Sequence, residues 1–170
     1  RLRGRELGGS RVRIITQAAS KFFGFGPVDA LGYQVMMSDR EKTAIDCLDH
    51  PDLAGGIDEA AAILATASRR LDWTKAVDYL ERIDSGALVR RFGWLVDHVK
   101  AELPPEVRTR LLQLAGRSRK TWLGVDPARV SAVEGAIGFD DTWRVFVNVT
   151  TDALRGSAGL ARRKTAKKDQ

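Results

Sequence analysis

Seven residues near the end of the chain, Trp143 to Val149, follow a pattern that restricts the fold. Every second side chain in this stretch is large and apolar, at Trp143, Val145, Val147 and Val149. A period of two predicts a β-strand with one buried face, and a strand needs a hydrogen-bonded neighbour. The other stretches that are typical of strands span residues 12–16, 21–25 and 33–37. We therefore expect one small sheet built from both ends of the chain.

The middle of the chain has the spacing of several helices separated by turn residues. Ser38 and Glu41 fit a capping box at the start of a first helix, and Pro51 ends it. Further apolar stripes follow Gly56, Asp72, Ser85 and Pro105. The chain has 170 residues, which is enough for one domain with a buried core. The sequence thus predicts an α/β (mixed α+β) domain with four or five helices packed on the small sheet.

The net charge of +6 is spread unevenly along the chain. Residues 1–15 and 155–170 are strongly basic, whereas residues 16–154 are slightly acidic. Basic ends favour contact with nucleic acid or with an acidic partner, but they also occur as solvated tails. Residues 154–170, rich in glycine, serine, alanine and basic residues, are expected to be a flexible tail.

Candidate catalytic groups are few. Cys47 and His50 have the spacing of a nucleophile and a base on one helix face, and Asp46, Asp49 and Asp52 could join His50 as metal ligands. A lone cysteine near an apolar stripe is usually a core residue, and acidic residues beside a helix end are usually solvated or paired. We therefore expect no enzyme activity, no cofactor, no metal and no small-molecule substrate.

Other composition features limit the class of protein. One cysteine excludes a disulfide scaffold and a multi-cysteine zinc site. The chain contains no apolar run of about 20 residues and nothing like a signal peptide, so we expect a cytoplasmic protein without a membrane partner.

Basic clusters are the candidate contact residues. Arginine pairs stand near predicted helix ends, where they also relieve the helix dipole. A further cluster lies in a loop beside Trp122, a setting that suits phosphate contact. The candidates for partner or nucleic-acid contact are Arg69, Arg70, Arg90, Arg91, Arg117, Arg119, Lys120, Arg162, Arg163 and Lys164.

Residues 38–57 (SDREKTAIDCLDHPDLAGGI) carry a resemblance to a known family. They resemble the signature of AbiEi-type antitoxins. Residues 91–95 (RFGWL), residues 143–148 (WRVFVN) and Phe22-Phe23-Gly24 resemble further family stretches, in the right order, so that the match spans about residues 11–149. We expect the motif residues to build the fold. They are Asp39, Glu41, Lys42, Thr43, Asp46, Pro51, Gly55, Gly56, Trp143 and Asn148.

The resemblance implies a bacterial toxin–antitoxin or phage-defence role. AbiEi-like antitoxins oppose nucleotidyltransferase-like toxins, and a typical member also binds its own promoter DNA through an N-terminal winged-helix domain. This chain resembles only the C-terminal part. Residues 1–10 are then expected to be a basic linker from a missing winged-helix domain, and residues 11–153 the antitoxin domain. The alternative function is a general nucleic-acid-binding module that uses the basic ends and loop.

Overall fold

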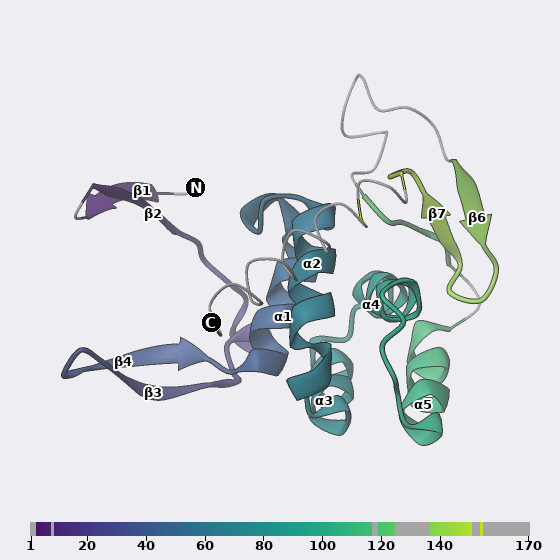
Figure 1. Ribbon diagram of the computed structural model, residues 1–170, viewed down its shortest axis with the longest axis horizontal. Helices are drawn as coiled ribbons and strands as arrows, with labels where there is room; N and C mark the ends of the chain where they lie inside the picture. The colour runs from purple at the N-terminus through teal and green to yellow at the C-terminus, as the bar shows by residue number, and fades with distance from the viewer. Residues whose placement is uncertain (1–2, 8, 117–118, 125–136, 151–153, 155–170) are drawn as a thin grey trace, which may run out of the picture.

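The computed structural model describes residues 3–7, 9–116, 119–124, 137–150 and 154 (Figure 1). These residues form five α-helices and three small β-sheets. The mixed α+β class expected from the sequence is therefore confirmed. None of the described helices is long and apolar enough to cross a membrane.

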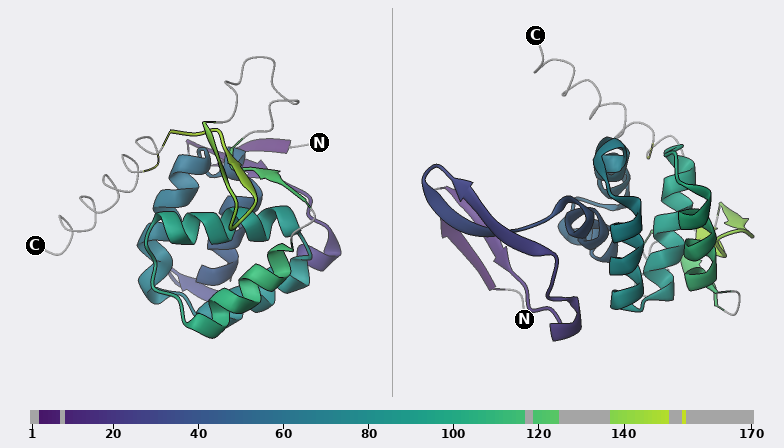
Figure 2. Two further views of the ribbon diagram at one scale, coloured as in Figure 1. Left: turned by 90° about the vertical axis from the view of Figure 1, so that its right-hand side faces the viewer. Right: turned by 90° about the horizontal axis from the view of Figure 1, so that it is seen from below.

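The helices lie at the centre of the molecule and pack directly on one another (Figures 1 and 2). They are α1 (Arg40–Asp49), α2 (Ile57–Ala67), α3 (Trp73–Ile83), α4 (Gly86–His98) and α5 (Pro105–Ala115), with 3-10 turns η1 (Ala19–Lys21), η2 (Pro51–Leu53) and η3 (Ser68–Arg70). Helix α1 contacts α2, α3 and α4, and α5 packs on α3 and α4. The core between them is mainly aliphatic, with Ile45, Leu48 and Leu95 fully buried.

Short polar side chains begin three of the five helices. The side chains of Asp39, Asp72 and Ser85 accept hydrogen bonds from backbone amides at the start of α1, α3 and α4. This satisfies amides that have no partner within the helix. The expected capping box from Ser38 to Glu41 is wrong by one residue. Asp39 caps α1, because Ser38 instead bonds the Thr43 hydroxyl and ends strand β4.

The strands form three separate sheets. Strands β1 (Arg3–Leu7) and β2 (Ser10–Ile14) make one antiparallel hairpin, and β3 (Phe25–Ala30) and β4 (Tyr33–Ser38) make another. The third sheet has the order β5-β7-β6, from β5 (Thr121–Trp122), β6 (Gly138–Asp140) and β7 (Val145–Val147). Strand β7 is parallel to β5 and antiparallel to β6.

The expectation of one sheet from both ends of the chain is wrong. Strands β5 and β6 take the two edges of β7, so β7 has no edge left to pair with the N-terminal strands. Each N-terminal pair is instead closed by its own turn, and local pairing costs less loop entropy than pairing across the chain. Figures 1 and 2 show both hairpins on one side of the helices and the β5-β7-β6 sheet on the opposite side.

Three smaller expectations also differ from the structure. Strand β1 lies within the predicted linker of residues 1–10. Residues 21–25 are not one strand, because η1 ends at Lys21 and β3 begins at Phe25. Leu154, where the predicted tail begins, is 1% exposed and belongs to the hydrophobic core. The remainder of that tail, residues 155–170, lies outside the described residues.

Candidate functional site

The acidic start of the family-like motif is fully engaged in contacts within the protein. Asp39 accepts hydrogen bonds from the Lys42 amide at 2.8 Å and from the Tyr79 hydroxyl at 2.7 Å. Glu41 accepts one from the Asp72 amide at 3.0 Å, so it joins α1 to α3. The Lys75 ammonium lies 3.1 Å from Asp39 and 3.2 Å from Glu41. This group of residues therefore clamps the two helices together.

The charged groups of this clamp shift the pKa values of Asp39 and Lys75. Partial burial alone would raise the pKa of Asp39, but hydrogen bonds from the Lys42 amide, Tyr79 and Lys75 outweigh it and lower that pKa. Hydrogen bonds to Asp39 and Glu41 raise the pKa of Lys75. Asp39 and Lys75 are thus both charged at neutral pH, as a stable ion pair requires.

The rest of the central motif is also occupied by structural contacts. Lys42 is 2% exposed, pairs with Asp46 at 2.5 Å and lies 5.3 Å from the Phe23 ring centroid. The Thr43 hydroxyl donates to the Asp39 carbonyl at 2.7 Å. Pro51 begins η2, and Gly55 and Gly56 adopt φ of 96° and 121°, a region that favours glycine.

Cys47 is poorly suited to serve as a nucleophile that His50 activates. Burial, together with the nearby Asp46 charge, raises the pKa of the Cys47 thiol, which disfavours the reactive thiolate. His50 lies 3.5 Å from Asp49, and Asp49 also pairs with Lys21 at 2.5 Å. Within the described part of the chain, no three histidine, cysteine, aspartate or glutamate residues are grouped so that they could hold a metal ion.

The arginine candidates divide into separate regions. Arg69 and Arg70 are exposed in η3, at the end of α2. Arg90 and Arg91 lie on α4, where the Arg91 Nε donates to the Trp122 carbonyl at 2.9 Å. Arg119 and Lys120 precede β5 and are exposed. The candidates Arg117, Arg162, Arg163 and Lys164 lie outside the described residues.

Arg144 is a functional candidate that the sequence analysis missed. Strands β5 and β7 are parallel, with Thr121 opposite Val145, so the residues just before each strand lie at the same end of the sheet. Arg119, Lys120 and Arg144 are therefore gathered there. The alternating pattern could have placed Arg144 on the face away from the core, but it gave no sign of this parallel partner.

The sheet end and α4 together form what we call the arginine cluster: Arg90, Arg119 and Arg144. Helix α4 packs against both β5 and β7. Burial, followed by the nearby charges of Arg119 and Arg144, lowers the pKa of Arg90. Arg90 thus lies close enough to Arg119 and Arg144 to be affected by their charges.

Aromatic side chains flank this cluster. Trp122 stacks on Phe146 with ring centroids 4.8 Å apart, and Phe139 lies at the same distance from Phe146. The Lys120 ammonium lies 5.1 Å from the Phe139 ring centroid, and the Arg144 guanidinium lies 5.5 Å from it. Such cation–aromatic contacts hold basic groups in place while leaving their charge available.

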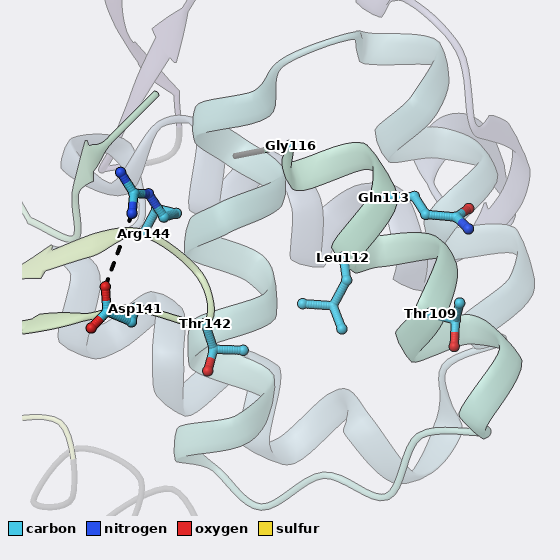
Figure 3. A pocket seen from close by; sticks show the side chains of 7 residues that line it. All are labelled: Thr109, Leu112, Gln113, Gly116, Asp141, Thr142 and Arg144. Carbon is cyan, nitrogen blue, oxygen red and sulfur yellow. Dashed lines mark ion pairs between the residues drawn. The ribbon is translucent and has the colours of Figure 1, made fainter. Parts of the chain in front are cut away.

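A pocket of about 770 Å³ opens beside Arg144, between α5 and the turn that precedes β7 (Figure 3). Figure 3 shows Asp141 and Arg144 facing each other at its edge, with their charged atoms 4.0 Å apart. Asp141 is 89% exposed in its side chain, so this pair is weak. The other lining residues are Thr109, Leu112, Gln113, Gly116 and Thr142.

The second and third family-like stretches meet in the core. A Cβ atom at Gly93 would come within 2.2 Å of the Trp143 ring, so the ring fits only because residue 93 is glycine. The Trp143 indole donates to Asp97 at 2.7 Å, and Asp97 also binds Arg108. Asn148, the last residue of the third stretch, accepts a hydrogen bond from the Gly124 amide at 2.8 Å.

Comparison with protein-family models, with curated proteins and with solved structures finds no match to this chain.

Proposed function

We propose that this chain is the toxin-neutralising domain of an AbiEi-type antitoxin, and that it opposes a nucleotidyltransferase-like toxin in the bacterial cytoplasm. In this proposal the domain acts by binding rather than by catalysis. Promoter binding belongs to a winged-helix domain elsewhere in the full-length protein.

One observation carries this proposal. The sequence resemblance rests on stretches that are far apart in the chain, and the third stretch packs directly against the second, through Trp143 on Gly93. A contact that needs a glycine in one stretch and a large ring in the other supports a shared fold.

The contacts of the central motif support a non-catalytic role. Asp39, Glu41 and Asp46 have the chemistry of acids, bases or metal ligands, but each already binds a lysine. Asp39 and Glu41 also accept backbone amide hydrogen bonds that start α1 and join it to α3. A carboxylate held in this way stabilises the fold and is poorly placed to exchange protons with a substrate.

Co-expression with the nucleotidyltransferase encoded beside this protein tests the proposal. We expect this chain to restore growth, to form a complex with the toxin on size-exclusion chromatography, and to leave the toxin's intact mass unchanged. Failure of rescue by this chain, while the full-length protein rescues, would contradict the assignment of neutralisation to this domain. A change in toxin mass would contradict the non-catalytic role.

A second candidate function is a nucleic-acid-binding module, favoured by the basic residues beside Trp122, Phe139 and Phe146. These three rings are half-buried; aromatic rings stack on bases, and nearby cations neutralise phosphates. This function predicts an affinity for DNA or RNA that falls steeply with salt. Fluorescence anisotropy with a labelled oligonucleotide at two salt concentrations measures how the affinity depends on salt. Absence of binding at low salt excludes the nucleic-acid-binding function.

A further inference from the structure

Arg90 combines burial with a lack of partners. It is 4% exposed, and its Nε has no hydrogen-bond partner. Among the described residues, no carboxylate lies within ion-pair distance of its guanidinium. Buried charges in proteins are normally paired and hydrogen-bonded. The Arg90 Nε is therefore a buried donor without an acceptor.

The surroundings of Arg90 are positive rather than negative. Arg119 and Arg144 both act on it by repulsion. The Arg144 Nε is also buried without a hydrogen-bond partner. Its backbone has a φ of 58°, a conformation that non-glycine residues rarely adopt and that tends to occur at functional sites. Two buried donors thus belong to one group of three cations.

The start of α4 adds to this positive environment. The position of a Cβ at Gly86 lies 3.2 Å and 3.4 Å from the two terminal guanidinium nitrogens of Arg90. The Arg90 side chain therefore runs back along α4 to its first residue, where the helix dipole is also positive. An arginine at this end of a helix is unfavourable unless an anion accompanies it.

We propose that the arginine cluster binds a compact phosphate-type oxyanion between Arg90, Arg119 and Arg144. The oxyanion accepts hydrogen bonds from the Nε atoms of Arg90 and Arg144, which have no hydrogen-bond partner, and its negative charge offsets the positive charge of the cluster. A phosphate monoester carries nearly two negative charges at neutral pH, and arginine forks match its oxygens.

The burial of Arg90 restricts the size of the ligand. The residue as a whole is only 4% exposed, so the sugar–phosphate backbone of a duplex cannot reach its side chain. Inorganic phosphate, or the terminal phosphate of a nucleotide, is small enough to enter the cluster from its open side, where the Arg144 side chain is 30% exposed. Arg119 is exposed and contacts the outer side of the same anion. The inference stands on these contacts alone and holds for either function proposed above.

Thermal unfolding of the whole chain in increasing phosphate tests the site, with potassium chloride holding the ionic strength constant. The melting temperature rises with phosphate as for any ligand that binds only the folded state. The variant R90M replaces a buried unpaired charge by an apolar side chain of similar length. It melts higher than the original chain without phosphate and gains nothing from phosphate.

Two exposed arginines provide matched variants that do not disturb the core. R119S weakens the apparent phosphate affinity about tenfold, which is the loss expected for one charged hydrogen-bonding group. R69S removes an equal charge from η3 and leaves the affinity unchanged. If R90M fails to fold, this pair decides the test, and equal affinities for R119S and R69S overturn the site.

Ligand choice distinguishes the source of the phosphate. Inorganic phosphate and a nucleoside 5′-monophosphate are compared with a single-stranded oligonucleotide that lacks a terminal phosphate. Binding of either small ligand, with loss in R119S, supports the proposal and identifies the preferred source. Binding of the oligonucleotide alone, or a melting temperature that phosphate raises no more than chloride does, overturns it.

Discussion

Gly93 is a residue for which the structure leaves no room for a side chain. The Trp143 ring crosses α4 at this point, and a Cβ on residue 93 would lie 2.2 to 2.4 Å from three ring carbons. The change G93A therefore forces the ring to move, although alanine itself favours helix. We expect a loss of about 1–3 kcal/mol in the free energy of unfolding, measured by urea denaturation.

Gly138 provides the control for Gly93. It lies in β6, and a Cβ there would meet no atom within 4 Å. We expect G138A to change stability by less than about 0.5 kcal/mol. Equal effects of the two alanines would show that the Trp143 ring does not pack as described.

Two adjacent phenylalanines differ sharply in their surroundings. Phe23 is 7% exposed and packs against Tyr79, Lys42 and Arg82, whereas Phe22 is 67% exposed. We expect F23A to cost about 3 kcal/mol or more, because it leaves a cavity in the core. The same change at Phe22 costs less than about 1 kcal/mol. Thermal melts of the two variants side by side test the assignment, and a larger loss for F22A contradicts it.

Helix α1 depends on the charge of its capping residue, and this gives stability a pH dependence. Because the folded pKa of Asp39 is lowered, its charge stabilises the protein above the unfolded pKa of about 3.9. That contribution is lost as the pH falls through the lower folded value. The change D39N keeps a side-chain oxygen that can accept the hydrogen bond from the Lys42 amide, but it removes the ion pair with Lys75. We expect it to cost about 1 kcal/mol at neutral pH.

The pH profile separates the charge of Asp39 from other effects. Urea unfolding at neutral pH and at pH values below about 4 should show the difference between D39N and the original chain shrinking with acid. D52N, at an exposed carboxylate in η2, is the control and changes little at either pH. A D39N effect that stays constant with pH would contradict the role of its charge.

The end of the described chain contributes to the core of the whole molecule. Leu154 is fully buried, although it begins the stretch that the sequence pattern assigned to a tail. We expect L154A to cost about 2–4 kcal/mol in urea denaturation. L112A, at a partly exposed leucine of α5, is the control and costs much less. A negligible effect of L154A would contradict the placement of Leu154 in the core.

The fold was predictable where the relevant interactions are local. Each helix has its own stripe of apolar residues, and Asp72, Ser85 and Pro105 mark helix starts within a few residues of where they occur. The arrangement of the strands was not predictable, because β5 has two residues and too short a pattern to detect. For the same reason, the approach of Arg119 to Arg144 could not be inferred from the sequence.

The candidate site was only partly predictable. Arg90, Arg119 and Lys120 were expected contact residues because they stand in basic clusters, but a cluster of charges in a sequence does not reveal burial. Arg90 comes near Arg119 and Arg144 because α4 packs against β5 and β7. The alternating pattern of residues 143–149 predicts that Arg144 is part of a strand, whereas it lies in the turn before β7.

The β3–β4 hairpin is expected to open before the rest of the molecule unfolds. Its apolar residues, among them Leu31, Tyr33 and Met36, are exposed, so opening the hairpin uncovers little new surface. An isolated two-stranded ribbon is only marginally stable, and such regions open without global unfolding. Its backbone amides should therefore exchange with solvent deuterium long before those of α1 and α4, and a protease should find the hairpin while the helices stay intact.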